Sequence, residues 1–113
     1  ANLCAVVDCN GLQISGTTEQ VMNHTKLADQ IRSFGWHVTD ADGNDIDKMI
    51  AAFEEAKTVS DRPTCIIAHT VKGFGGGALM ENQAAWHHHV PTKEEYDQIT
   101  AELKARKEAA EHE

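Results

Sequence analysis

The sequence is short of positive charge, of paired cysteines and of long apolar runs. It carries 10 Lys and Arg against 18 Asp and Glu, which gives a formal net charge of −8. Because a nucleic-acid backbone is bound through clustered Lys and Arg, this balance excludes nucleic acid as a main partner. No apolar run approaches the length of a membrane span and no signal-peptide pattern opens the chain, so we expect neither a membrane-bound nor a secreted protein.

The three cysteines, Cys4, Cys9 and Cys65, form no Cys-x-x-Cys pair. Two of them fall in or beside predicted buried strands. We therefore expect reduced thiols within the core and a cytoplasmic protein, with a zinc site as the alternative. The consecutive histidines 87–89 cannot all face one metal, which favours an acid, base or hydrogen-bond donor over zinc ligation.

Apolar periodicity divides the chain into alternating strands and helices. The expected elements are a strand over about 2–8, a helix over about 25–34, a strand over 36–39, a helix over 45–59, a strand over 64–68 and a helix over 93–110. Loops are expected at 9–20 and 71–91, and a turn at 40–44. Alternation of this kind predicts an α/β fold, a parallel sheet in a three-layer arrangement with flanking helices.

The first predicted strand points to a ligand site. Residues 3–7 are all apolar, which is typical of a strand buried on both faces of a parallel sheet. Asp8, Asn10 and two glycines follow at the carboxyl edge, where open α/β sheets bind ligands. The carboxylate, the Asn10 amide and the main-chain oxygen of Leu12 are hard oxygen donors of the kind that Mg²⁺ prefers.

Two other motifs fail on spacing. Residues 40–45 suggest a calcium loop, but Asp45 and Ala51 stand where an EF-hand needs Gly and Glu. A polar turn in which Asp45 caps the next helix fits better. The glycines in 73–77 lack the offsets of a dinucleotide-binding fingerprint, although they could let the backbone approach a phosphate.

Taken together, the motifs carry a family resemblance over nearly the whole chain. They are Val7-Asp8-Cys9-Asn10-Gly11-Leu12-Gln13-Ile14-Ser15-Gly16, Phe34-Gly35-Trp36-His37-Val38, Asp42-Gly43-Asn44-Asp45, Arg62-Pro63-Thr64, Thr70-Val71-Lys72-Gly73-Phe74-Gly75 and Trp86-His87. Their order resembles the thiamine-diphosphate-binding domain of transketolase, above all the N-terminal subunit of split transketolases. The resemblance implies that residues 1–113 are the C-terminal half of that domain, an incomplete thiamine-diphosphate-binding fold.

The resemblance assigns cofactor and metal roles. It implies that Asn10 ligates Mg²⁺ through its side chain and Leu12 through its main-chain oxygen. By the same likeness, Ile14 packs against thiamine diphosphate, and Asp8 orients the groups around the metal.

A second group of roles falls on the later loop. His87 matches a histidine near the diphosphate and the bound sugar, which makes it the candidate catalytic and cofactor-binding imidazole. Gly73 and Gly75 match the turn that leads from the strand into the cofactor site.

Departures from the family pattern occur at several positions. Ser15 stands where many members have Asp, Asn44 where they have His, and His88 where they have Gly. The Gly-Asp-Gly motif, whose aspartate is a further magnesium ligand, has no counterpart here. Because Ala1 stands almost on the first strand, we expect a missing N-terminal portion that carries this motif.

The activity implied for the complete enzyme is transfer of a two-carbon ketol unit between sugar phosphates. We expect the chain to need its missing N-terminal half and a C-terminal transketolase subunit, in a homo- or hetero-oligomer, and to be inactive alone. Two alternatives remain: a subunit of another thiamine-diphosphate enzyme, of the deoxyxylulose-phosphate synthase or 2-oxo-acid dehydrogenase type, or a catalytically inert α/β module.

Overall fold

The computed structural model describes residues 1–24 and 26–112, which form an α/β fold. Its elements in chain order are β1 (Cys4–Cys9), β2 (Leu12–Gln13), β3 (Gly16–Thr17), α1 (Thr18–Val21), α2 (Leu27–Ser33), β4 (His37–Asp42), α3 (Ile46–Thr58), β5 (Thr64–His69), the 3₁₀ helix η1 (Ala84–His87) and α4 (Lys93–Ala110). The predicted strand–helix alternation is therefore confirmed.

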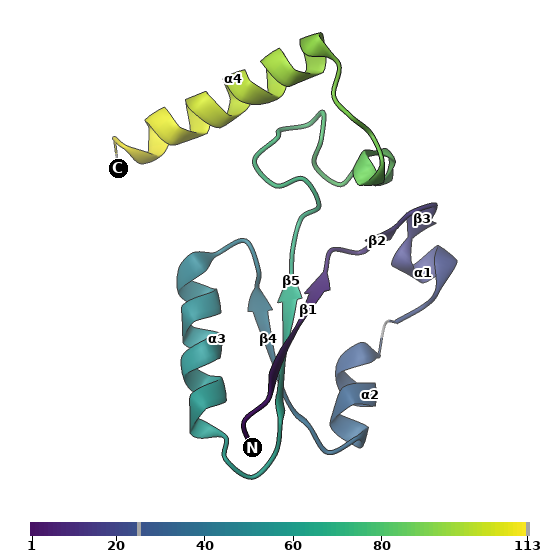
Figure 1. The fold of residues 1–113 in the computed structure, drawn as a ribbon, viewed down its shortest axis with the longest axis vertical. Helices are drawn as coiled ribbons and strands as arrows, with labels where there is room; N and C mark the ends of the chain where they lie inside the picture. Colours follow the sequence, from purple (N-terminus) through teal and green to yellow (C-terminus); the bar gives the residue numbers. More distant parts are fainter. Residues whose placement is uncertain (25, 113) are drawn as a thin grey trace.

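The main sheet has three parallel strands in the order β1–β5–β4 (Figure 1). Its register aligns Cys9 of β1 with His69 of β5, and His69 with Asp42 of β4. The three carboxyl ends consequently meet at one edge of the sheet. The helices α2 and α3 lie on opposite sides of the sheet, which gives the predicted three layers.

The central strand β5 and helix α2 form the best-packed part of the molecule. Residues 64–68 of β5 are all buried. On the α2 side, Val38, Cys65 and Ile67 make a core cluster, and Leu27 and Ile31 of α2 pack against it. Burying these side chains supplies the main stabilisation of the sheet.

The helix α2 ends at a glycine, as predicted. Gly35 has φ +85° and its N–H donates to the Arg32 oxygen at 2.9 Å. A left-handed residue at this place satisfies an otherwise unpaired helix carbonyl, and glycine adopts it without steric cost.

The helix α3 begins at the predicted cap. The Asp45 carboxylate accepts a hydrogen bond from the Lys48 N–H at 3.1 Å. The helix turns Ala52 into the sheet, whereas Ile50 and Phe53 of the predicted apolar stripe stay exposed. The amphipathic pattern is real, but only part of the stripe meets the sheet.

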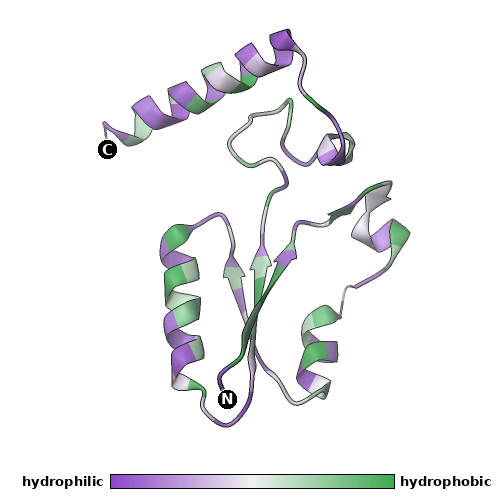
Figure 2. Ribbon diagram, in the orientation of Figure 1, coloured by the Kyte–Doolittle hydropathy of each residue, from purple (hydrophilic) through white to green (hydrophobic). Residues whose placement is uncertain are grey.

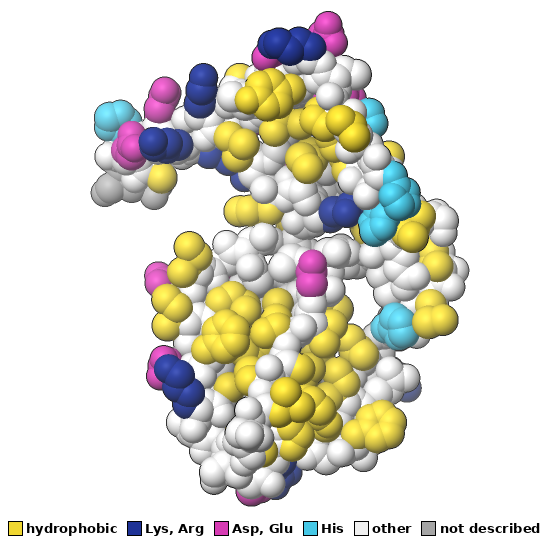
Figure 3. Space-filling view, in the orientation of Figure 1, with side chains coloured by type: hydrophobic (Ala, Val, Ile, Leu, Met, Phe, Trp, Pro, Cys, Tyr) yellow, Lys and Arg dark blue, Asp and Glu magenta, His cyan; other side chains and the backbone are white. Residues whose placement is uncertain are grey.

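The prediction that β1 is buried on both faces is wrong. β1 is an edge strand, and its Val6 side chain is 47% exposed while Val7, on the other face, packs against the core. Figure 2 shows the apolar character of β1 and β5, and Figure 3 shows apolar side chains gathered in the open over the front of the sheet. A continuous apolar run thus marks a strand meant for covering on both sides, and here β5 alone receives it.

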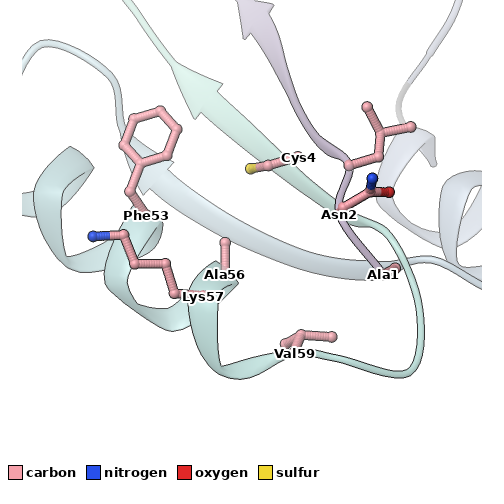
Figure 4. A pocket seen from close by; sticks show the side chains of 8 residues that line it. Ala1, Asn2, Cys4, Phe53, Ala56, Lys57 and Val59 are labelled. Atoms are coloured by element: carbon pink, nitrogen blue, oxygen red, sulfur yellow. The ribbon is translucent and has the colours of Figure 1, made fainter.

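The open side of the sheet is hollowed between β1 and α3. A groove of about 330 Å³ is lined there by Ala1, Asn2, Leu3, Cys4, Phe53, Ala56, Lys57 and Val59 (Figure 4). It lies by the amino end of β1, at the edge opposite the aligned carboxyl ends. The Cys4 thiol is exposed at this groove, so the expectation of core thiols holds for Cys65 and fails for Cys4.

Three predicted loop regions contain additional structure. The segment 9–20 holds the β2–β3 hairpin and the start of α1, and 71–91 holds η1. The predicted turn at 40–44 is wrong for its first half, because β4 continues to Asp42. Asp40 stays in the strand since its carboxylate accepts from His69 Nε2 at 2.8 Å and faces the Arg32 guanidinium at 3.8 Å.

The helix α4 stands apart from the sheet and is strongly capped (Figure 1). The Thr92 hydroxyl accepts from the Glu95 N–H at 3.2 Å, and the Glu95 carboxylate accepts from the Thr92 N–H at 2.8 Å. His89 Nε2 lies 2.7 Å from the same carboxylate. Within residues 1–24 and 26–112 no helix combines the length and apolar character that crossing a bilayer requires.

The capping carboxylate makes the start of α4 sensitive to acid. The hydrogen bond from His89, followed by that from the Thr92 N–H, lowers the pKa of Glu95. A lowered pKa in the folded state stabilises above the ordinary Glu value of about 4.3, and this contribution is lost as pH falls through the lowered value. We predict that α4 frays between about pH 5 and 3, measured by amide exchange across residues 93–97.

A Glu95→Gln variant provides the control for this prediction. Gln keeps the capping geometry but does not titrate, so its amide exchange over residues 93–97 should change less with acid. Equal acid sensitivity in both proteins would contradict the role given to Glu95.

Candidate functional site

Hydrogen bonds tie the loops together at the carboxyl edge of the sheet. The Gly43 N–H donates to the His69 oxygen at 2.8 Å, and the Val71 N–H donates to Asn44 Oδ1 at 2.7 Å. A Cβ at Gly43 would overlap Thr70 Cγ2 and approach Ala68 Cβ to 3.0 Å. Glycine is therefore required where the exits of β4 and β5 touch.

The exit of β1 is fixed by a turn at Asn10. Asn10 Oδ1 accepts a hydrogen bond from the Leu12 N–H at 2.9 Å, and Gly11 between them has φ +73°. The Gly11 oxygen in turn accepts from the Thr18 N–H at 2.9 Å. The β2–β3 hairpin is thereby folded against the strand end, and Asn10 Oδ1 keeps a second lone pair for a ligand.

A cavity of about 200 Å³ opens at this turn. Its wall consists of Val7, Asp8, Cys9, Asn10, Gly11, Leu12, Gln13, Thr18, His24 and Leu27. Among the described residues, the wall thus brings together three of the predicted site residues, Asp8, Asn10 and Leu12. Ile14, Gly73, Gly75 and His87 lie outside this wall.

The predicted metal donors are oxygens of neutral groups. Asn10 offers an amide oxygen and Leu12 a main-chain oxygen, while the Asp8 carboxylate accepts a hydrogen bond from the Thr70 hydroxyl. Within residues 1–24 and 26–112 no three His, Cys, Asp or Glu side chains are grouped to hold a metal. These donors fit one side of a magnesium shell, which would need further oxygens from a ligand and from other groups.

Ile14 stands at the tip of the β2–β3 hairpin. Its side chain is 61% exposed, beside the two-residue turn that connects Gln13 to Gly16. An apolar side chain held in solvent by a tight turn is available to pack on a bound ring, although it costs apolar exposure in the chain alone.

The glycine-rich loop after β5 is held by a different network. Gly73 and Gly75 have φ +73° and +94°, and a Cβ at Gly73 would lie 2.7 Å from the Met80 oxygen. The Gly75 N–H donates to Glu81 Oε1 at 2.9 Å, and Arg106 Nη2 donates to the same oxygen at 2.8 Å. The structure thus requires both glycines for the turn, as their predicted place in the sequence indicates.

His87 ends the 3₁₀ helix η1 and is exposed. Its ring meets the His88 ring edge-to-face at 4.5 Å, and the neighbouring Trp86 is anchored by a 3.0 Å hydrogen bond from Nε1 to the Leu79 oxygen. His89 differs from the other two because it is bound to Glu95. Of the three histidines, His87 and His88 therefore remain as candidates for contact with a ligand.

One residue of the cavity wall was missed by the sequence reasoning. His24 comes from the segment between α1 and α2 and lines the cavity opposite the β1 exit. It belongs to no motif, and local periodicity does not predict that this segment returns to the end of β1. Only the three-dimensional arrangement brings this imidazole to Asn10.

The chain matches known proteins along almost its whole length. The family described as the transketolase, thiamine diphosphate binding domain matches residues 1–109. One of the two subunits of an apulose-4-phosphate transketolase from Phocaeicola vulgatus is 41% identical over 112 residues, and a 6-deoxy-6-sulfo-D-fructose transketolase subunit of Clostridium sp. is 37% identical over 102 residues. These matches cover 99% and 90% of this chain.

Solved transketolases share the fold. A transketolase from Campylobacter jejuni superposes with a TM-score of 0.81 at 25% identity, over 91% of this chain and 16% of that one. A Pichia stipitis transketolase in complex with sedoheptulose-7-phosphate superposes with a TM-score of 0.80 at 30% identity, over 91% and 15%.

The chain spans 40% of the length of the P. vulgatus relative and 37% of the Clostridium one. Within that share, the match runs from the β1 exit through the glycine-rich loop to α4. The chain belongs to the transketolase family, in its thiamine diphosphate binding domain.

Proposed function

We propose that this chain supplies one wall of the thiamine-diphosphate and Mg²⁺ site of a transketolase-type transferase, which moves a two-carbon ketol unit between sugar phosphates. The observation that carries the proposal is the cavity at the β1 exit, whose wall contains both Asn10 and the main chain of Leu12. The family match over residues 1–109 supports it. Bound thiamine diphosphate would supply the carbon–carbon bond chemistry.

In this proposal each predicted residue binds or orients. Asn10 and Leu12 hold Mg²⁺ through neutral oxygens, which leaves the charge of the ion for the diphosphate. Ile14 packs on the cofactor, and Gly73 and Gly75 let the loop after β5 approach it. His87 donates a hydrogen bond to a diphosphate or substrate oxygen and so stabilises developing charge there.

The wall would be completed by other polypeptide. We propose that residues 1–113 form the C-terminal half of the diphosphate-binding domain, and that an N-terminal half and a C-terminal transketolase subunit complete the oligomeric enzyme. The open apolar side of β1 and α3 supports this, because large exposed apolar patches mark interaction sites. The three free cysteines support a reducing, cytoplasmic setting.

The first prediction concerns the reaction. The chain assembled with its completing polypeptides should transfer two carbons from a ketose phosphate to an aldose phosphate, and only with thiamine diphosphate and Mg²⁺ present. The chain alone should show negligible turnover. Consumption of pyruvate in place of the ketose phosphate would reassign the enzyme to another thiamine-diphosphate class, and full activity of the chain alone would contradict the proposed completion.

The second prediction concerns the metal. Asn10→Ala should weaken Mg²⁺-dependent cofactor binding by the assembled enzyme about 10- to 100-fold, since losing a metal-site group has costs of this order. Calorimetric titration of the cofactor at several Mg²⁺ concentrations measures it. Asn2→Ala, which removes the same side chain at the opposite end of β1, is the control. Equal binding by both variants would show that Asn10 is merely structural.

The third prediction separates the adjacent imidazoles. His87→Ala should lower kcat/KM for the sugar phosphates about 100-fold, as expected when a positioned donor is lost. His88→Ala should leave kcat/KM nearly unchanged. Because both residues are exposed, neither variant should disturb folding, which far-ultraviolet circular dichroism checks. The reverse result would move the role from His87 to His88.

A further inference from the structure

The cavity at the β1 exit has an uneven distribution of charge. Its acidic members are Asp8 and the thiol of Cys9, and its predicted metal donors are neutral. Among the described residues of its wall, His24 is the single side chain that can carry positive charge, since no Lys or Arg lines it. A site for a diphosphate needs hydrogen-bond donors aimed at anionic oxygens.

His24 is also placed independently of the known motifs. Its main-chain oxygen accepts from the Leu27 N–H at 2.9 Å, which fixes the backbone just before α2. Leu27 lines the same cavity and packs against the core cluster of the sheet. The backbone at His24 is therefore held by a main-chain bond, and the imidazole side chain is exposed at the cavity mouth.

From this placement we infer that His24 is a further ligand-binding residue, which donates a hydrogen bond from its imidazole to the Mg²⁺-bound diphosphate. The inference rests on the proposed function and deepens it. Magnesium held by Asn10 and Leu12 shares its shell with ligand phosphates. An oxygen of that diphosphate then lies within the cavity whose opposite wall carries His24. The imidazole supplies the donor that the β1 exit lacks.

The test uses magnesium pyrophosphate as the probe and the full 113-residue chain labelled at its histidines. Pyrophosphate at millimolar concentration with Mg²⁺ should move the His24 ring resonances in NMR spectra. His24→Ala should weaken this binding about tenfold, the size expected for one charge-assisted hydrogen bond. His24→Gln, which keeps an N–H donor without the charge, should lose less. The main-chain bond to Leu27 persists in both variants, so the fold should be retained.

Two controls separate this inference from the proposed function. His112→Ala removes an imidazole just beyond α4 and should bind like the unmodified chain. Asn10→Ala should lose binding because the metal is lost. If Asn10→Ala loses binding while His24→Ala stays within about twofold of the unmodified chain, the role of His24 is overturned and the proposed site stands. If the unmodified chain shows no binding at all, both are overturned.

The source of the anion is tested by a further titration. Inorganic phosphate without Mg²⁺ should leave the His24 ring resonances in place, because the proposed contact is to a metal-held diphosphate. Equal shifts with phosphate alone would place His24 on the phosphate of a sugar and overturn the assignment to the diphosphate.

Discussion

The pairing of β5 with a parallel strand on each side is the constraint on which the rest of the structure depends. Its residues 64–68 are buried, and its register aligns the ends of β1 and β4 with its own end at His69. Three chain exits consequently lie within the reach of short polar side chains. The bond from the Val71 N–H to Asn44 and the contact of Gly43 with Ala68 exist only because of that alignment. The cavity at Asn10 is a product of the sheet register.

The two faces of this sheet are closed unequally, and the difference separates stability from assembly. On one face α2 buries a cluster around Val38 and Ile67, which holds the end of β1 in place. On the other face α3 turns mainly Ala52 inward, so Val6 and Phe53 remain exposed around an open groove. The face that supports the candidate site is thus packed within the chain. The face left open suits a partner surface, and covering it would stabilise the site without altering its lining.

The sequence predicts most elements because their apolar periods are strong, and it fails where tertiary contacts decide. The helix over 93–110 is predicted with its observed bounds, since a capping box and a polar helical pattern are local signals. The apolar run at 3–7 predicts a strand but cannot say what covers it. The strands β2 and β3 are too short to show a period of two. Asp40 resembles a turn residue, and only its contacts with His69 and Arg32 explain why it remains in β4.

The neutral character of the donors at the β1 exit has a consequence for the order of binding in the proposed site. Amide and main-chain oxygens such as those of Asn10 and Leu12 neutralise none of the charge on Mg²⁺, so they hold the free ion weakly. An anionic diphosphate then gains from the uncompensated charge, and the ion gains equally from the diphosphate, because such coupling between ligands is reciprocal. The carboxylate of Asp8, held by Thr70, adds charge nearby without being freed as a ligand. A site with this donor set therefore favours metal and diphosphate together over either one alone.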